Sequence, residues 1–441
     1  MRVARRGVLA GIVSALVARG GGLAAQQKPA AGQPAQLQVS LAEAVRRALD
    51  VQPAMVQARG EARNAGANKL SAWGAFLPTL STSASASRSN QDRFDPNSTT
   101  RLPPGYAYSG GLFASLQLFD GFQRFANLRA TSASEDAASA GLINQRYQTT
   151  LATQQAFFTA LADGEFVRVA EAQLQRAREE LQIAVNKFQA GAATRSDTLT
   201  ATVDLGNARL ALLQAQANLA TAQASLGRQI GIDQPVTAVP DSTFPELPDT
   251  TTLRSSAQAT APVVGQADAQ ARAARAQTWS ARSLYWPTLS LTYNNSRTGV
   301  SSPNLPLFNG YPETSVWRFS LQWTLFNGFG REQSQVAANV SRDIAEAQAA
   351  DARRLVNAQL TQQLAALFTA YTQLSITQAN VAAATEALRV QQERYRLGAS
   401  TLLDLLTAQA NMTQAEVNQV SARYNYLIAR AQVEALVGHP L

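Results

Sequence analysis

The sequence contains few residues whose type and spacing could support catalysis. Its single histidine, His439, lies two residues from the C-terminus, and the chain has no cysteine. These counts exclude disulfides, thiolate metal sites and cysteine nucleophiles, and they leave no Ser–His–Asp set and no multi-histidine zinc site. We therefore expect a protein that is not an enzyme and that has no catalytic, cofactor-binding or metal-binding residues.

Two further features have simpler explanations than chemistry. The fragment Gly328-Phe-Gly330 lacks the strand–turn–helix setting of a nucleotide-binding loop, so a joint between a strand and a helix explains it better. The acidic residues Asp163, Glu179 and Glu180 are interpreted as charges on helix surfaces.

The most specific polar motif occurs twice. Thr194 precedes Asp197 by three residues, and Thr401 precedes Asp404 by the same spacing. This spacing is that of a capping box at a helix N-terminus, with Asp in place of the usual Glu. A glycine stands three residues before each threonine, where a positive φ can end the preceding helix. Each motif therefore predicts a tight turn between two helices, at 189–197 and at 396–404.

The two turns belong to an internal duplication. Matching landmarks lie 207 residues apart, as in 328 − 121. The matching pairs are Gly121 and Gly328, Gly191 and Gly398, Asp197 and Asp404, and Gly231 and Gly438. Two such long copies indicate a duplicated protomer and not a solenoid of short repeats. We divide the chain into a first structural repeat at 26–230, a proline-rich connector or equatorial segment at 231–262, and a second structural repeat at 263–441.

Each repeat contains two segments in which polar and apolar residues alternate. In the second repeat, Trp317, Phe319 and Leu321 alternate with Arg318 and Ser320. A period of two with one apolar face indicates a strand that lies between two different solvents. The expected strands lie at about 78–89, 108–119, 287–295 and 315–326, and each can reach the length of a tilted outer-membrane strand.

Three observations favour a membrane over the half-buried sheet of a soluble domain. All five Trp lie in or just before the strand segments, aromatic residues cluster where helices meet strands, and the loops at 88–107 and 295–315 are long and polar. The chain has no apolar run of about 20 residues, so any part that spans a membrane consists of strands. Closing a barrel takes about eight strands or more, so four strands per chain require several copies, and three copies would supply twelve.

The segment from Phe329 to Tyr395 contains no proline and predicts a helix on the order of 100 Å long. Residues at steps of four and three along it have the spacing of a left-handed coiled coil. This seam comprises Leu360, Leu364, Leu367, Tyr371, Leu374, Gln378, Val381, Thr385, Leu388, Gln392 and Tyr395. A returning helix continues the pattern at Leu406, Ala410, Thr413, Val417, Val420, Tyr424, Leu427 and Ala431. Frequent alanine off the seam favours a ring in which each helix has two neighbours, and a helical bundle with a dry centre is the alternative.

Residues 1–25 have the features of a secretory signal peptide. Arg2, Arg5 and Arg6 precede an apolar run at 7–17, and the small residues at 20–25 offer a cleavage site. An amphipathic N-terminal anchor is the alternative. Removing 1–25 takes away four arginines and no acid, so the net charge falls from +8 to (38 − 4) − 30 = +4. That charge is weak for nucleic-acid binding, and we expect no nucleic-acid partner.

With these features the chain resembles the TolC family of outer-membrane efflux proteins. The resemblance rests on the duplicated layout, on the pattern Tyr395-x-x-Gly398-x-x-Thr401-x-x-Asp404, and on Leu-Phe-Asn-Gly-Phe at 325–329 and Ala-Arg-Tyr-Asn-Tyr-Leu-Ile at 422–428. It implies a mixed fold of α-helices and transmembrane β-strands, in which a long helical coiled-coil barrel joins a β-barrel completed by trimerisation. It also implies outer-membrane lipid around the barrel, a periplasmic adaptor (membrane fusion protein) and an inner-membrane transporter of the RND, ABC or MFS type.

The resemblance assigns roles to the two turns. Asp404 falls where family members place an acidic ring that narrows the periplasmic entrance of the channel. A second acidic ring and a tip arginine of the best-known members would fall at Thr407 and Ser400, so a doubly acidic, salt-bridge-locked gate is not expected. The residues expected to dock the adaptor are Gly191, Ala192, Thr194, Gly398, Ala399 and Thr401.

Two functions follow from these observations. The first is an outer-membrane exit duct of a tripartite efflux or type I secretion system, which is a passive conduit with its helices in the periplasm. The alternative is a periplasmic coiled-coil scaffold or adaptor protein without a membrane barrel, in which the strands form a soluble sheet. Release by osmotic shock would separate the alternative from a duct that fractionates with the outer membrane.

Overall fold

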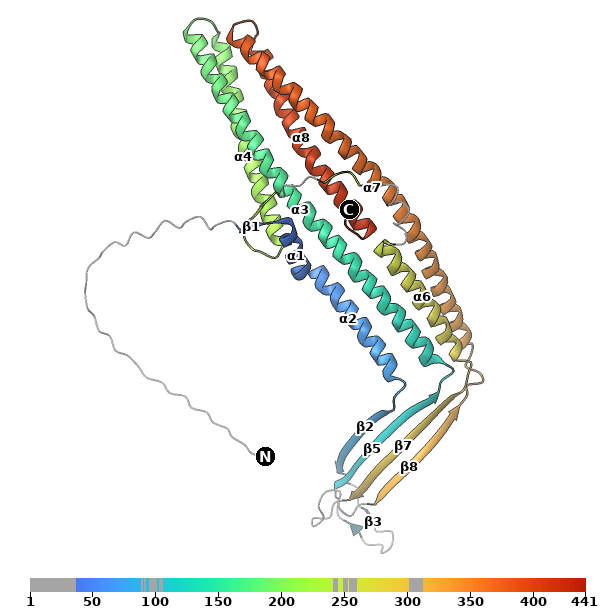
Figure 1. The fold of residues 1–441 in the computed structure, drawn as a ribbon. Helices are drawn as coiled ribbons and strands as arrows, with labels where there is room; N and C mark the ends of the chain where they lie inside the picture. The colour runs from blue at the N-terminus through green and yellow to red at the C-terminus, as the bar shows by residue number, and fades with distance from the viewer. Residues whose placement is uncertain are drawn as a thin grey trace, which may run out of the picture.

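The computed structural model describes residues 37–88, 90, 93–94, 101–102, 106–240, 245–248, 253, 260–300 and 312–441. The chain is elongated, with a four-stranded sheet at one end and the turns between long helices at the other (Figure 1). The signal peptide expected at 1–25 lies outside the described residues, as do parts of the segment 231–262 and of the loops between paired strands.

The sheet is antiparallel and has the order β2-β5-β7-β8. Its strands are β2 (Thr79–Arg88), β5 (Tyr106–Phe119), β7 (Thr288–Val300) and β8 (Glu313–Gln322). In the segment of the chain that connects β2 to β5, two short strands, β3 (Arg93–Phe94) and β4 (Arg101–Leu102), pair with each other. The polar loop expected at 295–315 is shorter than expected, because β7 continues to Val300 and pairs there with β5.

The register of the sheet separates an apolar face from a polar face. Leu291 pairs with Phe319 and Tyr293 pairs with Trp317, whereas the neighbouring position Thr292 pairs with Arg318. Because side chains alternate along a strand, these pairs lie on opposite faces. The apolar face becomes polar toward the far end of the strands, where Arg297 forms an ion pair with Glu313 at 2.7 Å.

The helices form two long hairpins and two shorter segments that lead into the sheet. The hairpins are α3 (Gln123–Gln189) with α4 (Arg195–Gln229), and α7 (Gly330–Arg396) with α8 (Leu402–Val437). Helices α2 (Pro53–Gly74) and α6 (Pro262–Ser283) begin with proline, which fits the first turn of a helix because its missing N–H has no partner there. Both α3 and α7 have 67 residues, so each runs for about 100 Å.

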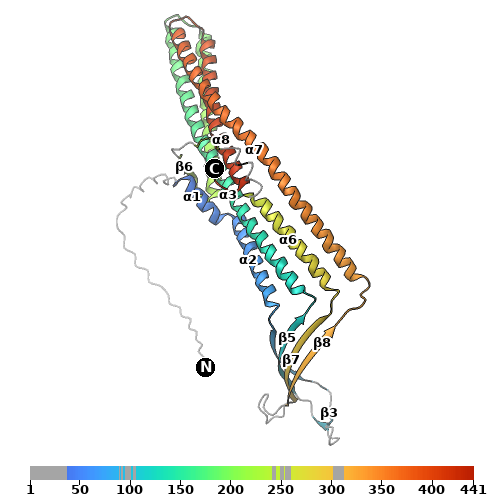
Figure 2. The same ribbon diagram turned by 45° about the vertical axis from the view of Figure 1, so that its right-hand side comes forward.

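The helices and strands lie side by side in one curved layer. Near the sheet the packing order is α2-α3-α6-α7, and toward the turns it is α4-α3-α8-α7. Figures 1 and 2 show this order continuing from the sheet order β2-β5-β7-β8. One edge of the layer is therefore formed by β2, α2 and α4, and the other by β8 and α7.

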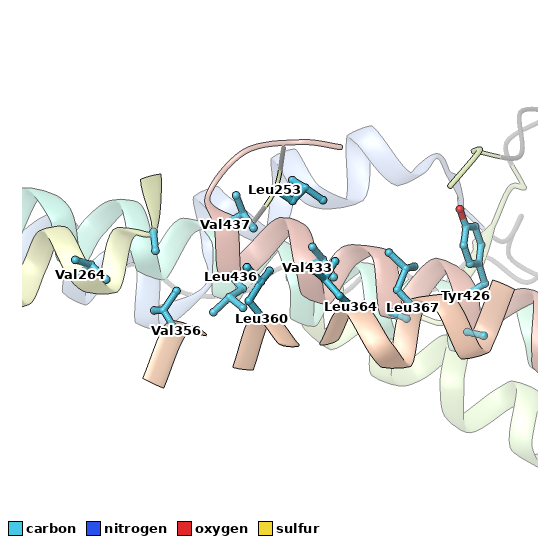
Figure 3. Close-up of a cluster of buried hydrophobic side chains, with 13 residues drawn as sticks. Leu253, Val264, Val356, Leu360, Leu364, Leu367, Tyr426, Val433, Leu436 and Val437 are labelled. Atoms are coloured by element: carbon cyan, nitrogen blue, oxygen red, sulfur yellow. The ribbon is translucent and has the colours of Figure 1, made fainter. Parts of the chain in front are cut away.

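The largest hydrophobic clusters lie near the middle of the elongated molecule, between the sheet and the hairpin turns. Strand β1 (Leu37–Val39) pairs in parallel with β6 (Val236–Ala238), and α1 (Leu41–Val51) packs beside them on α3. Leu360, Leu364 and Leu367 of α7 pack against buried residues of α8, such as Val433 and Tyr426 (Figure 3). This cluster joins the two helices of the second repeat below the hairpin turn.

The predicted coiled-coil seams are partly right. In α7 the seam is buried at 360–367 and again at Leu388 and Tyr395, but Tyr371, Gln378 and Thr385 between them are exposed. In α8 the predicted seam residues Tyr424 and Leu427 pack on α3, and a different set faces α7. The reason is that α8 lies between α3 and α7 and buries one face against each, so a single seam does not describe both contacts.

The joints between sheet and helices are rich in aromatic side chains. Phe122 and Phe329 both have positive φ, at 68° and 65°, immediately after a glycine that also has positive φ. These paired left-handed residues turn the chain from β5 into α3 and from the end of β8 into α7. Trp73 lies 5.9 Å from Phe76, measured between ring centroids, and both Phe122 and Phe329 expose more than half of their surface. Among the described residues, no helix is both long enough and apolar enough to cross a membrane.

Candidate functional site

The turn of the second hairpin has the predicted capping geometry. The Thr401 hydroxyl accepts the Asp404 backbone N–H at 3.2 Å, and the Asp404 carboxylate accepts the Thr401 backbone N–H at 3.0 Å. Gly398 has a φ of 78°, which reverses the chain after α7. The turn is therefore held by reciprocal hydrogen bonds that begin α8.

The turn of the first hairpin repeats this arrangement. The Asp197 N–H donates to the Thr194 hydroxyl at 3.2 Å, the Asp197 carboxylate accepts the Thr194 N–H at 2.8 Å, and Gly191 has a φ of 73°. The two turns lie at the same end of the molecule, away from the sheet (Figure 1). All the residues expected to dock the adaptor are exposed there: Gly191, Ala192, Thr194, Gly398, Ala399 and Thr401.

Asp404 is exposed and ionised. Hydrogen bonds from the backbone and hydroxyl of Thr401 hold the pKa of the Asp404 carboxyl below its ordinary value, and the positive charge of Arg394 adds to this effect. The carboxyl group borders a groove of about 480 Å³ between α7 and α8, together with Thr407 and Asn411 of α8 and Val390 of α7. Asp404, Thr407 and Asn411 follow each other at helical spacing and form a polar stripe on α8.

The two hairpins are connected near their turns by contacts that local sequence patterns do not predict. The Lys187 ammonium donates a hydrogen bond to the Tyr395 carbonyl and lies 3.8 Å from the centroid of the Tyr395 ring. Farther from the turn, Arg176 of α3 pairs with Glu416 of α8 at 3.0 Å, and both side chains are mostly buried. Helical periodicity places Arg176 on α3 and Glu416 on α8, but it does not show that α3 and α8 are neighbours.

Glu180 corrects one prediction. It was expected on the helix surface, but its side chain is only 2% exposed, and neither carboxyl oxygen has a hydrogen bond of normal geometry. Burial raises the pKa of the Glu180 carboxyl to about 7, an effect that the Gln409 amide reduces and the Asp204 carboxyl increases. Glu180 is buried because α4 and α8 cover two sides of α3 at this position, whereas its neighbour Glu179 is exposed as expected.

The two edges of the layer expose apolar side chains at helical spacing. On the side of α4 that faces away from α3, these side chains are Leu199, Val203, Leu210 and Leu213, each 58–66% exposed. On α7, opposite its face on α6 and α8, they are Val336, Val340, Ile344 and Ile376, each 50–61% exposed. Strands β2 and β8 leave unpaired backbone groups along the same two edges. Each edge is thus an incomplete interface, and the number of strands per chain predicted such open edges for the sheet.

The two repeats of the chain match the model of a known protein family. The family model described as outer membrane efflux protein matches residues 44–231 and 253–439, which are the two repeats in succession. The chain belongs to the outer membrane efflux protein family. Its match in two blocks follows the duplication that the landmarks at 207-residue spacing had indicated.

Individual proteins to which the chain is similar agree with this assignment. Protein CyaE of Bordetella pertussis is 28% identical over 422 residues, which cover 90% of this chain and 81% of that protein. The outer membrane efflux protein BepC of Brucella suis is 24% identical over 371 residues, which cover 82% and 77%. The CmeC outer membrane channel of Campylobacter jejuni superposes with a TM-score of 0.78 at 21% identity, covering 90% of this chain and 85% of that one.

Membership of the efflux family establishes the architecture and the broad function. The chain is an outer-membrane channel, a trimer whose β-barrel closes only when three copies combine, and its helices project into the periplasm. It serves as the exit duct of a tripartite system and works with an adaptor and an inner-membrane pump. The alternative of a periplasmic scaffold with a soluble sheet is therefore wrong.

Members of the family are channels and not enzymes. Within the part of the chain that the structure describes, no three His, Asp or Glu side chains group as a metal site would require.

Proposed function

We propose that this chain is a passive conduit that carries out no chemistry, whose periplasmic entrance is narrowed by Asp404 and whose hairpin turns dock the adaptor. One observation carries the proposal: the Asp404 carboxylate is exposed, ionised and fixed by a capping box. The hairpin turn that contains this capping box lies at the end of the molecule that is farthest from the membrane sheet. In a trimer, three such carboxylates surround one axis. Three negative charges around a narrow aqueous path attract cations and raise the barrier for anions.

The two capping boxes supply a matched test of the Asp404 ring. Asp404→Ala and Asp197→Ala remove the same hydrogen bonds from equivalent turns, at a cost of roughly 1 kcal/mol each. In single-channel recordings, we expect Asp404→Ala to weaken block by hexaamminecobalt(III) by roughly tenfold, because a trivalent cation gains most from the ring. Asp197→Ala should leave the block unchanged. Unchanged block in Asp404→Ala would remove the ring from the proposal.

The hairpin turns are proposed as the docking surface because they are the exposed end of the periplasmic part. Six residues with small side chains or none are exposed to solvent there. A Cβ atom placed on Gly191 or Gly398 would meet no atom within 4 Å. A partner helix or loop can therefore approach the backbone closely at both turns. We expect Ala192→Arg and Ala399→Arg to abolish co-purification of the adaptor while leaving the trimer intact, and Ala399→Ser to retain it. Full adaptor binding by both arginine variants would contradict the docking assignment.

The remaining finer assignments are part of the same proposal. The inner-membrane partner is a transporter of the RND, ABC or MFS type, and the apolar face of the sheet contacts outer-membrane lipid. Side chains such as Phe319 and Leu321, each about 70% exposed in the single chain, support the lipid contact. The chain divides into a signal peptide at 1–25, repeats at 26–230 and 263–441, and an equatorial connector at 231–262.

A further inference from the structure

The polar face of the membrane sheet is almost free of charge. On this face β2 presents Thr79 and four serines, and β7 presents only Ser, Thr and Asn side chains between Thr288 and Thr298. Strand β5 adds serine, glutamine and small residues, with Phe113 as its one large apolar side chain. Within the four strands that the structure describes, Arg318 is the one charged side chain on the polar face.

The register fixes the orientation of Arg318. The row Thr79, Ser115, Thr292 and Arg318 runs across all four strands, and each member pairs with the next. The adjacent row contains Leu80, Ala114, Tyr293 and Trp317 and lies on the apolar face. Since the apolar face is the one that contacts lipid, the row with Arg318 faces the lumen of the barrel.

Arg318 has no partner among the described residues. Its side chain is exposed, and no ion pair or hydrogen bond joins it to the described part of the chain. The nearest acidic residue on β8, Glu313, lies on the opposite face and is paired with Arg297 at 2.7 Å. Arginine side chains are cations in proteins.

Trimer formation does not supply a partner from the neighbouring strand. Closing the barrel joins the β8 edge of one copy to the β2 edge of the next, because these are the two edges of the sheet. The sequence of β2, TLSTSASASR, contains no Asp or Glu. Three guanidinium groups that have no partner among the described residues therefore surround the barrel axis, near the middle of a strand that runs from Glu313 to Gln322.

We propose that the three Arg318 side chains form a cationic ring in the barrel lumen that attracts anionic solutes and sets the ion preference of the outer-membrane part of the channel. An arginine side chain extends about 6 Å from the wall, and its field reaches about 8 Å farther at physiological ionic strength. The low-dielectric barrel wall and lipid concentrate that field in the water-filled lumen. The ligands of this ring are small inorganic anions and the carboxylate, phosphate or sulfate groups of exported molecules.

The test measures ion selectivity of the intact trimer in planar bilayers. A gradient of potassium chloride across the membrane gives a reversal potential and hence the chloride-to-potassium permeability ratio. The recordings use an Asp404→Asn background, so that a charge at the periplasmic turn does not mask the barrel. Arg318→Gln is expected to lower the ratio by about twofold or more, and Arg318→Lys to preserve it, because only the first variant removes the charge.

Two variants at Ser320, the next residue on the same face, complete the experiment. Adding Ser320→Arg to Arg318→Gln returns a charge to the lumen and should restore the ratio. Ser320→Glu alone keeps Arg318 but gives it a carboxylate two residues away, and should lower the ratio even if Arg318→Gln fails to assemble. An unchanged ratio in SDS-resistant trimers of Arg318→Gln, or in those of Ser320→Glu, would overturn the proposal.

Discussion

The hairpins α3–α4 and α7–α8 have nearly the same backbone but different surroundings. Their first helices have the same length, their turns carry the same capping box, and both begin with two consecutive residues of positive φ. Helix α3 lies inside the layer and packs on α2, α4, α6 and α8, whereas α7 lies at an edge and packs on α6 and α8. Duplication thus preserved local geometry while position in the layer changed what each copy must contact.

The joints with the sheet show this difference most directly. A Cβ built on Gly121 would lie 2.6 Å from the Ser283 carbonyl oxygen and 2.8 Å from the Trp286 Cβ, while one on Gly328 would meet no atom within 4 Å. Near the first joint, Asp120 is buried and pairs with Arg124 at 3.0 Å. The equivalent position in the second repeat is the neutral Asn327. The inner joint is completed within one chain, and the outer joint is left open for the next copy.

The largest effect is expected from a charge placed on an open edge. Leu210→Glu puts a carboxylate in the apolar row of α4, and burying an unpaired charge against a neighbouring copy costs several kcal/mol. We expect almost complete loss of the SDS-resistant trimer in outer-membrane extracts. Gln216→Glu is the matched control, because Gln216 is exposed on α4 but lies about a quarter turn away from the middle of that row. Normal trimer yield from Leu210→Glu would show that α4 is not part of the interface.

A smaller effect is expected from a methyl group at the two joints. Alanine at either Gly121 or Gly328 must adopt a positive φ, which costs roughly 1–2 kcal/mol. Gly121→Ala also forces the close contacts with Ser283 and Trp286, for which overpacking adds typically about 1–3 kcal/mol. Heat denaturation of the purified trimer should therefore show a lower midpoint for Gly121→Ala than for Gly328→Ala. Equal midpoints would mean that the neighbouring copy packs the outer joint as tightly as the chain packs the inner one.

The smallest effect is a change in the pH dependence of stability, and it arises from Glu180. Because burial raises the pKa of Glu180 from its ordinary value of 4.5 to about 7, the packed state prefers the protonated carboxyl. The stabilisation from this group is greatest below pH 4.5 and is lost as the pH rises to about 7. Glu180→Gln should match the wild type at pH 4.5 and be more heat-stable at pH 8. Glu179 is exposed, so Glu179→Gln should leave the heat stability unchanged at both pH values. A Glu180→Gln variant whose heat stability depends on pH as that of the wild type does would contradict the burial argument.

The parts of this architecture that depend on local sequence could be predicted. The alternation around Trp317 and Phe319 identified β8 and its apolar face, and the Thr–Asp spacing identified both turns. These features involve residues close together in the chain, and hydrogen bonds or pleating link them regardless of what surrounds them.

The parts that depend on neighbouring helices could not be predicted in the same way. Glu180 lies in a charged helical segment that looks like a solvent-facing surface, and only the packing of α4 and α8 on α3 buries it. The contact between Lys187 and Tyr395 likewise joins residues more than 200 positions apart. In an alanine-rich sequence, where many helix faces are equally able to pack, the choice among them is made by tertiary structure.

The two incomplete edges also have a genetic consequence. A copy that is damaged at one edge still has a normal opposite edge, so it can enter a ring that it cannot close. If damaged and intact chains are made in equal amounts and mix at random, only about one-eighth of the rings contain three intact copies. Edge mutations should therefore be dominant over a normal gene, whereas mutations that prevent the chain from folding should be recessive, because such chains never reach a ring.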